Sequence, residues 1–235
     1  MSPDPTPRLE WIRPPQQARS QDTLDRILDA AEGLVSEKGF EDTTVADVVA
    51  RAGSSVGAFY ARFHDKDGLL YALYERYLAQ AMATADVALE PSRWEGIGVA
   101  GILRAVTRFL VAIYRQQEGL IRAFVIRNHT DGEFRARQAR LSHHVNEGLG
   151  RLLLARVDEV RREPYERSVA FGLAMVFATL EGLMLFGETR SRDLRLTDDE
   201  LATELATAFL AYLGVPEGPP SPSPAKRRKR KESLG

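Results

Sequence analysis

The stretch Thr44–Lys66, TVADVVARAGSSVGAFYARFHDK, decides the fold of this 235-residue chain. Thr44 can cap a first helix, and Asp47 completes a variant of the capping box with Asp in place of the usual Glu or Gln. Apolar residues then recur at helical spacing, and Gly53 supplies the positive φ that ends this helix at low cost.

A second short helix follows at once. Ser54 or Ser55 can cap it, and Val56–Ala61 forms its body. Two helices of about eight residues are not stable alone, so they must pack against other elements. The spacing fits both a helix-turn-helix and an ordinary helical hairpin.

Helical periodicity also governs the rest of the chain. An amphipathic helix over Ser20–Lys38, ended by Gly39, supplies support for the hairpin, and Asp65 caps a long helix over Lys66–Ala88. Further helices are expected over Ser92–Arg115, Glu118–Asn128, Asp131–Arg161, Tyr165–Glu188 and Glu200–Leu213. No segment alternates like a strand, so we predict an all-α fold.

Composition excludes several classes of function. The chain has no cysteine, which excludes disulfides, thiolate catalysis and cysteine-ligated zinc. The four histidines give no metal signature; His143 and His144 are neighbours and would point in different directions on a helix. We find no catalytic constellation, and we expect no enzyme activity, no metal and no cofactor. No signal-peptide pattern is present, so we expect a cytoplasmic protein without membrane association.

The two ends differ from the body of the chain. Residues 1–17 are Pro-rich and are expected to form a disordered arm, and residues 216–235 a disordered tail. Lys226–Lys231, KRRKRK, carries six positive charges, which leaves the rest of the chain at −7 of a total of −1. Either this tail adds non-specific DNA affinity or it is simply solvated.

The run Gly96–Gly101, GIGVAG, matches the spacing of a dinucleotide-binding fingerprint. Such a fingerprint requires a preceding apolar strand, and the residues before Gly96 do not form one. We therefore treat a nucleotide-dependent enzyme as a remote alternative.

The residues from Ala30 to Leu73 resemble the N-terminal domain of TetR-family transcriptional regulators. The resemblance rests on the helix ending in Gly39-Phe40, on Ala52-Gly53, on the Gly57-x-Phe59-Tyr60-x-x-Phe63 run, and on Lys66 at the next helix start. It implies a helix-turn-helix DNA-binding domain over residues 18–66 and a helical regulatory and dimerisation domain over residues 67–215.

The resemblance also implies a DNA-contacting surface on the helix-turn-helix. It assigns backbone phosphate contacts, base readout or both to Thr44, Ser54, Ser55, Val56, Gly57, Tyr60, Arg62 and Lys66. Val56 and Ala58 are apolar where the family commonly has polar residues, so base readout would rely on thymine methyl contacts, on Ser55 and on Arg62. Acidic residues outnumber Lys and Arg between Ala18 and Lys66, so shape and backbone contacts should matter more than charge.

For the C-terminal domain, the resemblance implies a homodimer and a small-molecule effector. The helix over Ser168–Glu188 is nearly apolar on all sides, which fits either a dimer interface with Glu200–Leu213 or an internal core helix. Candidate pocket residues are Trp94, Phe109, Phe124, His144, Phe171 and Met175, which would suit an apolar or aromatic ligand. The same residues could form an ordinary core, in which case the domain would only dimerise.

Overall fold

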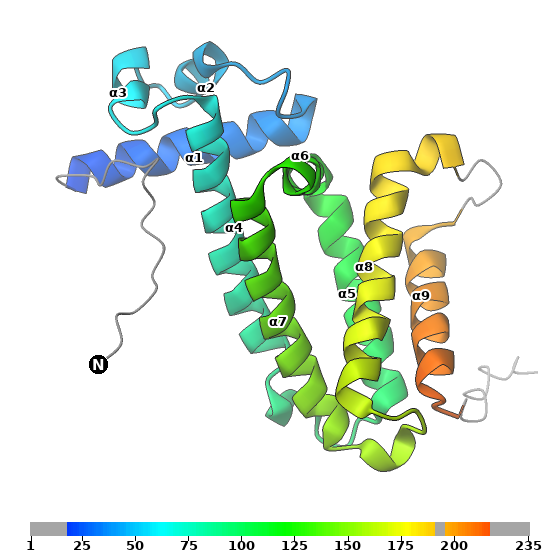
Figure 1. The fold of residues 1–235 in the computed structure, drawn as a ribbon. Coiled ribbons are helices and arrows are strands. Elements are labelled where there is room, and N and C mark those ends of the chain that lie inside the picture. The colour runs from blue at the N-terminus through cyan, green and yellow to red at the C-terminus, as the bar shows by residue number, and fades with distance from the viewer. Residues whose placement is uncertain (1–17, 191–195, 217–235) are drawn as a thin grey trace, which may run out of the picture.

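The structure, a computed structural model, describes residues 18–190 and 196–216, and this part of the chain is helical without any strand (Figure 1). The α-helices are α1 (Ala18–Lys38), α2 (Val45–Arg51), α3 (Val56–Tyr60), α4 (Lys66–Ala88), α5 (Val99–Gln116), α6 (Glu118–Thr130), α7 (Gly132–Leu154), α8 (Tyr165–Arg190) and α9 (Asp198–Leu213). Two 3-10 turns, η1 (Pro91–Trp94) and η2 (Val157–Glu159), join them. The predicted all-α fold is confirmed. The predicted arm over residues 1–17 and the basic tail with Lys226–Lys231 lie outside the described residues.

The helix-turn-helix forms because its caps work as the sequence predicts. The Thr44 hydroxyl accepts from the Asp47 N–H at 3.1 Å, and the Asp47 carboxylate accepts from the Thr44 N–H at 3.1 Å. Gly53 adopts a φ of 56° just beyond α2. Of the two serines, Ser55 caps α3 by accepting from the Ala58 N–H at 3.1 Å.

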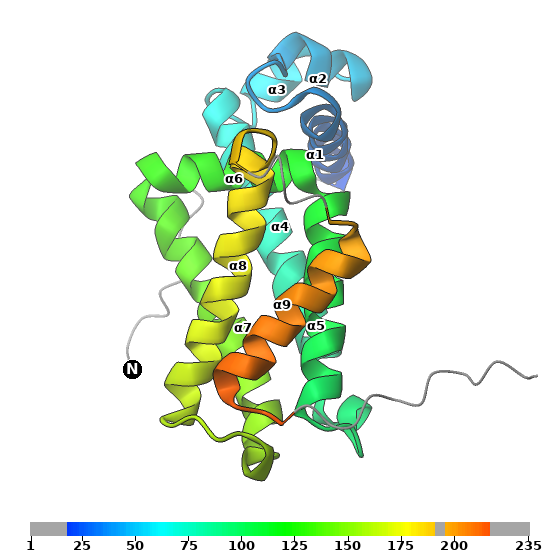
Figure 2. The ribbon, with the colours of Figure 1, turned by 90° about the vertical axis from the view of Figure 1, so that its right-hand side faces the viewer.

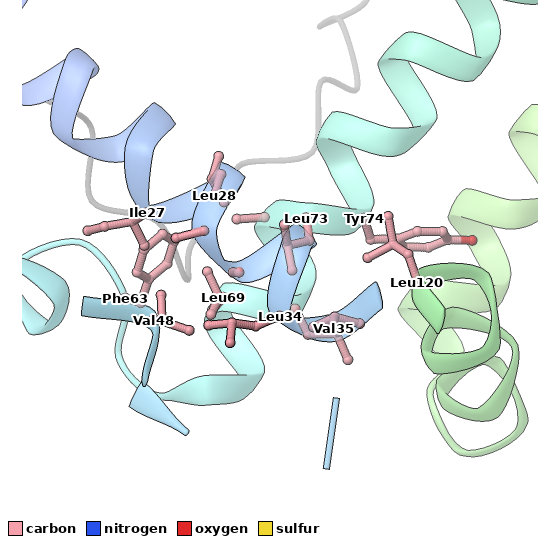
Figure 3. Close-up of a cluster of buried hydrophobic side chains, with 14 of the residues drawn as sticks. Ile27, Leu28, Leu34, Val35, Val48, Phe63, Leu69, Leu73, Tyr74 and Leu120 are labelled. Atoms are coloured by element: carbon pink, nitrogen blue, oxygen red, sulfur yellow. The ribbon is translucent and has the colours of Figure 1, made fainter. Parts of the chain in front are cut away.

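One hydrophobic core holds α1, α2, α3 and the first half of α4 together (Figure 3). Ile27, Val48 and Phe63 are fully buried in it. The core continues into the C-terminal half, because Leu120 of α6 and Phe134 of α7 belong to the same cluster. The head, which we define as residues 18–66, is thus fixed to the helices that follow it.

The remaining helices form a bundle below the head. Helix α4 runs beside α7, and α9 packs against α5 and α8. Figure 2 shows α8 and α9 together on one face of the bundle, with α6 lying across its upper end next to α1.

Two predicted helices are too long. The helix expected over Ser92–Arg115 is interrupted: η1 ends at Trp94, and α5 begins only at Val99, because Gly96 takes a φ of 72°. The helix expected over Asp131–Arg161 ends at Leu154 and gives way to η2.

Candidate nucleic-acid interface and regulatory cavity

Helix α3 has a buried and an exposed face. Phe59 and Phe63 lie in the core and fix the helix. Val56 and Tyr60 are 50% and 47% exposed. Ser55 and Gly57 are exposed beside them, so four of the eight predicted DNA contacts form one surface.

The other four predicted contacts are engaged within the chain or withdrawn from the surface. The Thr44 hydroxyl is used in the capping box of α2. The Ser54 hydroxyl is buried without a hydrogen-bond partner in the structure. Arg62 donates to the Ala58 carbonyl at 2.8 Å, and Lys66 donates to the Glu41 carbonyl at 2.9 Å. These side chains position the turns around α3.

One exposed polar side chain near α3 was not among the predicted contacts. The His64 side chain is 84% exposed, and its Nδ1 lies 3.0 Å from the Asp65 carboxylate. It lies in the bend that follows α3, and no helical spacing marks it in the sequence.

Ion pairs within the head reduce its positive character. The Lys38 ammonium lies 2.7 Å from the Asp47 carboxylate. This contact, together with the Thr44 hydroxyl, lowers the pKa of Asp47. The Arg51 guanidinium binds both oxygens of Glu37, at 2.8 and 2.7 Å. Two cations of the head are therefore neutralised by acids of the same chain.

The bundle contains a partly open cavity of about 710 Å³. Its walls come from α4, η1, α5, α7 and α8 and are largely apolar, with a few polar side chains between them. The apolar and aromatic lining includes Ala81, Leu89, Trp94, Val106, Phe109, Leu110, Ile113, Leu141, Val145 and Phe177, and the polar lining includes Tyr77, Gln80, Thr84, Arg93, Tyr114, Gln117, Gln138 and Ser142.

The structure does not bring the six predicted pocket residues together. Trp94 and Phe109 line the cavity, and the other four do not. Phe124 belongs to the core shared with the head, and His144 binds the Asp86 carboxylate at 2.8 Å. Phe171 is 52% exposed and stacks on Tyr212, with ring centroids 5.1 Å apart. Met175 is partly buried on α8.

Two partly buried phenols line the end of the cavity next to α6, and a carboxylate lies next to one of them. Burial raises the pKa of Tyr77 to about 12, with a smaller contribution from Glu181. Burial and the neighbouring Glu181 carboxylate also raise the pKa of Tyr114. The pKa of Glu181 itself is raised by burial, which the Tyr114 hydroxyl and His129 partly oppose.

The GIGVAG run has a structural explanation. The Glu159 carboxylate accepts from the Val99 N–H at 2.8 Å and so occupies the N-terminus of α5. A Cβ atom on Gly98 would lie 2.8 Å from that carboxylate. The place where a dinucleotide phosphate would bind is taken by an anion of the chain itself.

Helix α8 has an apolar face that the bundle does not cover. Phe171 and Phe186 are 52% and 45% exposed. By length and composition the stretch Tyr165–Phe186 could cross a membrane, a test that core helices of soluble proteins also pass. Within the described residues α8 packs on α5, α6, α7 and α9.

These features define a helix-turn-helix protein with a helical C-terminal bundle. A model of the family described as bacterial regulatory proteins, tetR family, matches residues 27–73. Residues 27–73 therefore form a DNA-binding domain of the TetR type.

The relatives divide into sequence matches to about a quarter of the chain and structural matches to about four fifths of it. An uncharacterized HTH-type transcriptional regulator of Bacillus subtilis, YvdT, is 36% identical over 58 residues, which is 25% of this chain and 30% of YvdT. The match thus spans less than a third of that relative. SmeT, the repressor of the Stenotrophomonas maltophilia multidrug efflux pump SmeDEF, has 24% identity and a TM-score of 0.59 over 84% of this chain and 94% of SmeT. The Bacillus subtilis regulator FadR, in complex with stearoyl-CoA, has 16% identity and a TM-score of 0.58 over 80% and 97%.

Proposed function

We propose that this protein is a cytoplasmic, homodimeric transcriptional repressor that a small apolar or aromatic molecule releases from its operator. The observation that carries the proposal is the exposed surface of α3 on a firmly packed head. Phe59 and Phe63 anchor that helix from below, while Val56 and Tyr60 face outward. A helix presented in this way enters the DNA major groove in helix-turn-helix proteins.

The four exposed residues of this surface take different roles. Ser55 and Val56 face base edges, and Val56 contacts a thymine methyl group. Gly57 has no side chain, so it lets the DNA approach the helix closely. Tyr60 donates its hydroxyl to a phosphate, which positions the helix without reading sequence.

A second copy of the chain covers the apolar face of α8 and α9. Phe171 and Tyr212 form its aromatic part, and Figure 2 shows both helices on one open face of the bundle. Two heads held in this way bind a pseudo-palindrome with half-sites about one DNA turn apart. The same burial accounts for the hydropathy of α8 without a membrane.

The cavity supports control by a ligand. A cavity of about 710 Å³ is in the range that holds drug-sized molecules. A C-terminal domain that only dimerised would be expected to pack this space. The stearoyl-CoA complex of FadR and the repressor role of SmeT agree with the proposal. The remote alternative, a dinucleotide-dependent enzyme, is disfavoured because Glu159 occupies the start of α5.

Selection of bound sequences from random double-stranded DNA, with purified full-length protein, tests the DNA-binding part. We expect a pseudo-palindromic site whose half-sites lie about 10 base pairs apart. A bound sequence without two-fold symmetry would contradict the dimeric arrangement, and no enrichment over input would contradict DNA binding.

Two variants on α3 then separate the roles of its side chains. Tyr60→Ala should weaken binding to all sequences alike, because it removes a phosphate contact. Val56→Ala should instead reduce the preference for thymine at one position of each half-site, by about 1 kcal/mol. If Tyr60→Ala keeps its overall affinity for DNA and loses only its preference between DNA sequences, the role of Tyr60 is assigned wrongly.

A further inference from the structure

The cavity has two chemically different ends. Arg93 and Trp94 lie at the end formed by η1, where a guanidinium is available. Tyr77, Tyr114 and Gln117 line the opposite end, next to the junction of α5 and α6. The groups at this second end, the α6 end, are hydrogen-bond acceptors, phenols and aromatic faces.

Gln117 offers an acceptor that the folded chain leaves unused. Its Oε1 is buried and has no hydrogen-bond partner in the structure. A buried carbonyl oxygen without a donor is costly, and native structures seldom leave one unsatisfied. A ligand N–H group in the cavity would satisfy it.

A carboxylate lies directly behind the aromatic wall of the α6 end. Glu181 follows the lining residue Phe177 by four residues and so lies on the same side of α8. Its carboxylate interacts with the hydroxyl of Tyr114. Among the side chains that the structure describes, those of residues 22–186 and 196–216, no Lys or Arg forms an ion pair with Glu181. His129, which is exposed on α6, lies close enough to lower the pKa of Glu181.

The aromatic rings complete the arrangement. The rings of Tyr114 and Phe177 are 6.5 Å apart between centroids, and both line the cavity. Tyr77 packs with Tyr114 against Met184 in a small apolar cluster between α6 and α8. Aromatic faces around a desolvated site attract cations, and an adjacent carboxylate strengthens that attraction.

We propose that the α6 end of the cavity binds the ammonium group of a lipophilic amine, whose apolar body extends toward Trp94 and Phe109. Gln117 accepts a hydrogen bond from the ammonium, the rings of Tyr114 and Phe177 contact it, and Glu181 neutralises its charge. This inference rests on the proposed ligand control and specifies the class of ligand. An anionic head at the same end would meet a carboxylate and an unpaired acceptor, so it is disfavoured there.

A matched series of ligands tests this assignment on the full-length protein. 4,4-Diphenylbutylamine, 4,4-diphenylbutanol and 4,4-diphenylbutanoate share one apolar body and differ only in the charge of the head. Binding is measured by calorimetry and by the change in intrinsic tryptophan fluorescence, to which Trp94 of the cavity lining contributes. We expect the amine to bind about tenfold more tightly than the alcohol, and the carboxylate to bind most weakly.

Glu181→Gln provides the specific variant. It should lower the affinity for the amine relative to that for the alcohol about tenfold, and it should leave the affinity for the alcohol unchanged. Asp158→Asn, at an exposed carboxylate of η2, is the control and should change neither affinity. Circular dichroism melting confirms that both variants fold. If Glu181→Gln does not fold, the ligand series on the unmodified protein still decides the question.

Equal binding of the three ligands, or tightest binding of the carboxylate, would overturn the inference. Loss of operator binding is measured separately in the presence of each ligand. An amine that binds with the expected preference but leaves operator affinity unchanged would uphold this inference and contradict ligand control. An alcohol or carboxylate that releases DNA more effectively than the amine would uphold ligand control and contradict this inference.

Discussion

The head and the bundle use their apolar residues in opposite ways. In the head, Phe59 and Phe63 are fully buried, and every helix contributes to one closed core (Figure 3). In the bundle, Phe109 is 42% exposed and lines a cavity, and Phe171 is 52% exposed on α8. A closed core fixes one geometry, whereas a cavity and an uncovered face leave room for a ligand and a partner. The head is built to present a rigid surface and the bundle to respond to other molecules.

Truncating one phenylalanine in each region should give the largest difference. Phe63→Ala should lower the free energy of unfolding by about 3–5 kcal/mol, because it opens a void in a closed core. Phe109→Ala should lower it by only about 1–2 kcal/mol, because much of that ring is already exposed. Denaturant unfolding of both variants measures the pair. Equal losses of unfolding free energy would show that the cavity wall is packed as tightly as the core of the head.

A charge on the uncovered face tests whether a second copy covers it. Phe171→Asp should raise the dissociation constant of the dimer at least about a hundredfold, because the carboxylate would be buried without a partner. Operator binding should fall with it. Val87→Asp, which places the same charge at a 57% exposed position on α4, is the control and should leave the dimer intact. Sedimentation measures both; an unchanged Phe171→Asp dimer would assign the interface elsewhere.

The boundary between the two regions can be tested at a glycine. A Cβ atom on Gly119 of α6 would lie 2.6 Å from the Val35 carbonyl oxygen and 2.9 Å from the Ser36 Cα, both backbone atoms of α1. Because a backbone cannot yield as a side chain does, Gly119→Ala should cost about 1–3 kcal/mol. It should also displace the head relative to the bundle and weaken operator binding.

Gly150→Ala is the matched control for this boundary. Nothing lies within 4 Å of a Cβ atom at Gly150 of α7. Alanine there should stabilise the helix by up to about 1 kcal/mol. If both variants gained stability, α6 and α1 would not be in the close contact that the coupling of the two regions requires.

More of the structure of the head than of the bundle could be predicted from sequence, because the head depends more on interactions between residues close together in the chain. Thr44, Gly53 and Asp65 act on the residues next to them, so caps and turns follow from short spacings. Phe109 and Phe124 have the same helical pattern, yet one lines the cavity and the other lies in the shared core. Which neighbour a helix face meets depends on packing between distant segments, which periodicity does not encode.

Two further details depend on the same limit. Arg62 and Lys66, which the resemblance assigns to DNA, both donate to carbonyl groups of their own chain. The helix predicted from Ser92 breaks at Gly96, where a short turn meets the carboxylate-capped start of α5. That carboxylate comes from Glu159, about sixty residues later in the chain. Contacts of this length are set by the tertiary fold.

The smallest expected effect is a pH dependence of stability. It distinguishes the two regions because they shift the pKa of a carboxyl group in opposite directions. In the head, the Gly68 N–H and then His64 lower the pKa of Asp65, the cap of α4. In the bundle, burial raises the pKa of Glu181. In an unfolded chain both side chains have pKa values of about 4.

The signs of the two pH dependences follow from linkage. Asp65 binds its proton less readily in the folded state, so its contribution to stability is present above pH 4 and is lost as the pH falls through its folded pKa. Glu181 binds its proton more readily in the folded state, so it destabilises the fold as the pH rises from about 4 through its folded pKa. Asp65→Asn should therefore be less stable than the unmodified protein at pH 7, and Glu181→Gln more stable. Both differences should shrink toward pH 3.

Thermal melting of the two variants and the unmodified protein between pH 3 and pH 8 measures these differences. Asn caps a helix nearly as well as Asp, so the change at Asp65 reports the charge and not the cap. If Glu181→Gln is instead less stable than the unmodified protein, and increasingly so as the pH rises, the carboxylate is already paired in the folded protein. The α6 end of the cavity would then have no charge to offer a ligand, and the contrast between a closed head and a responsive bundle would lose its chemical basis.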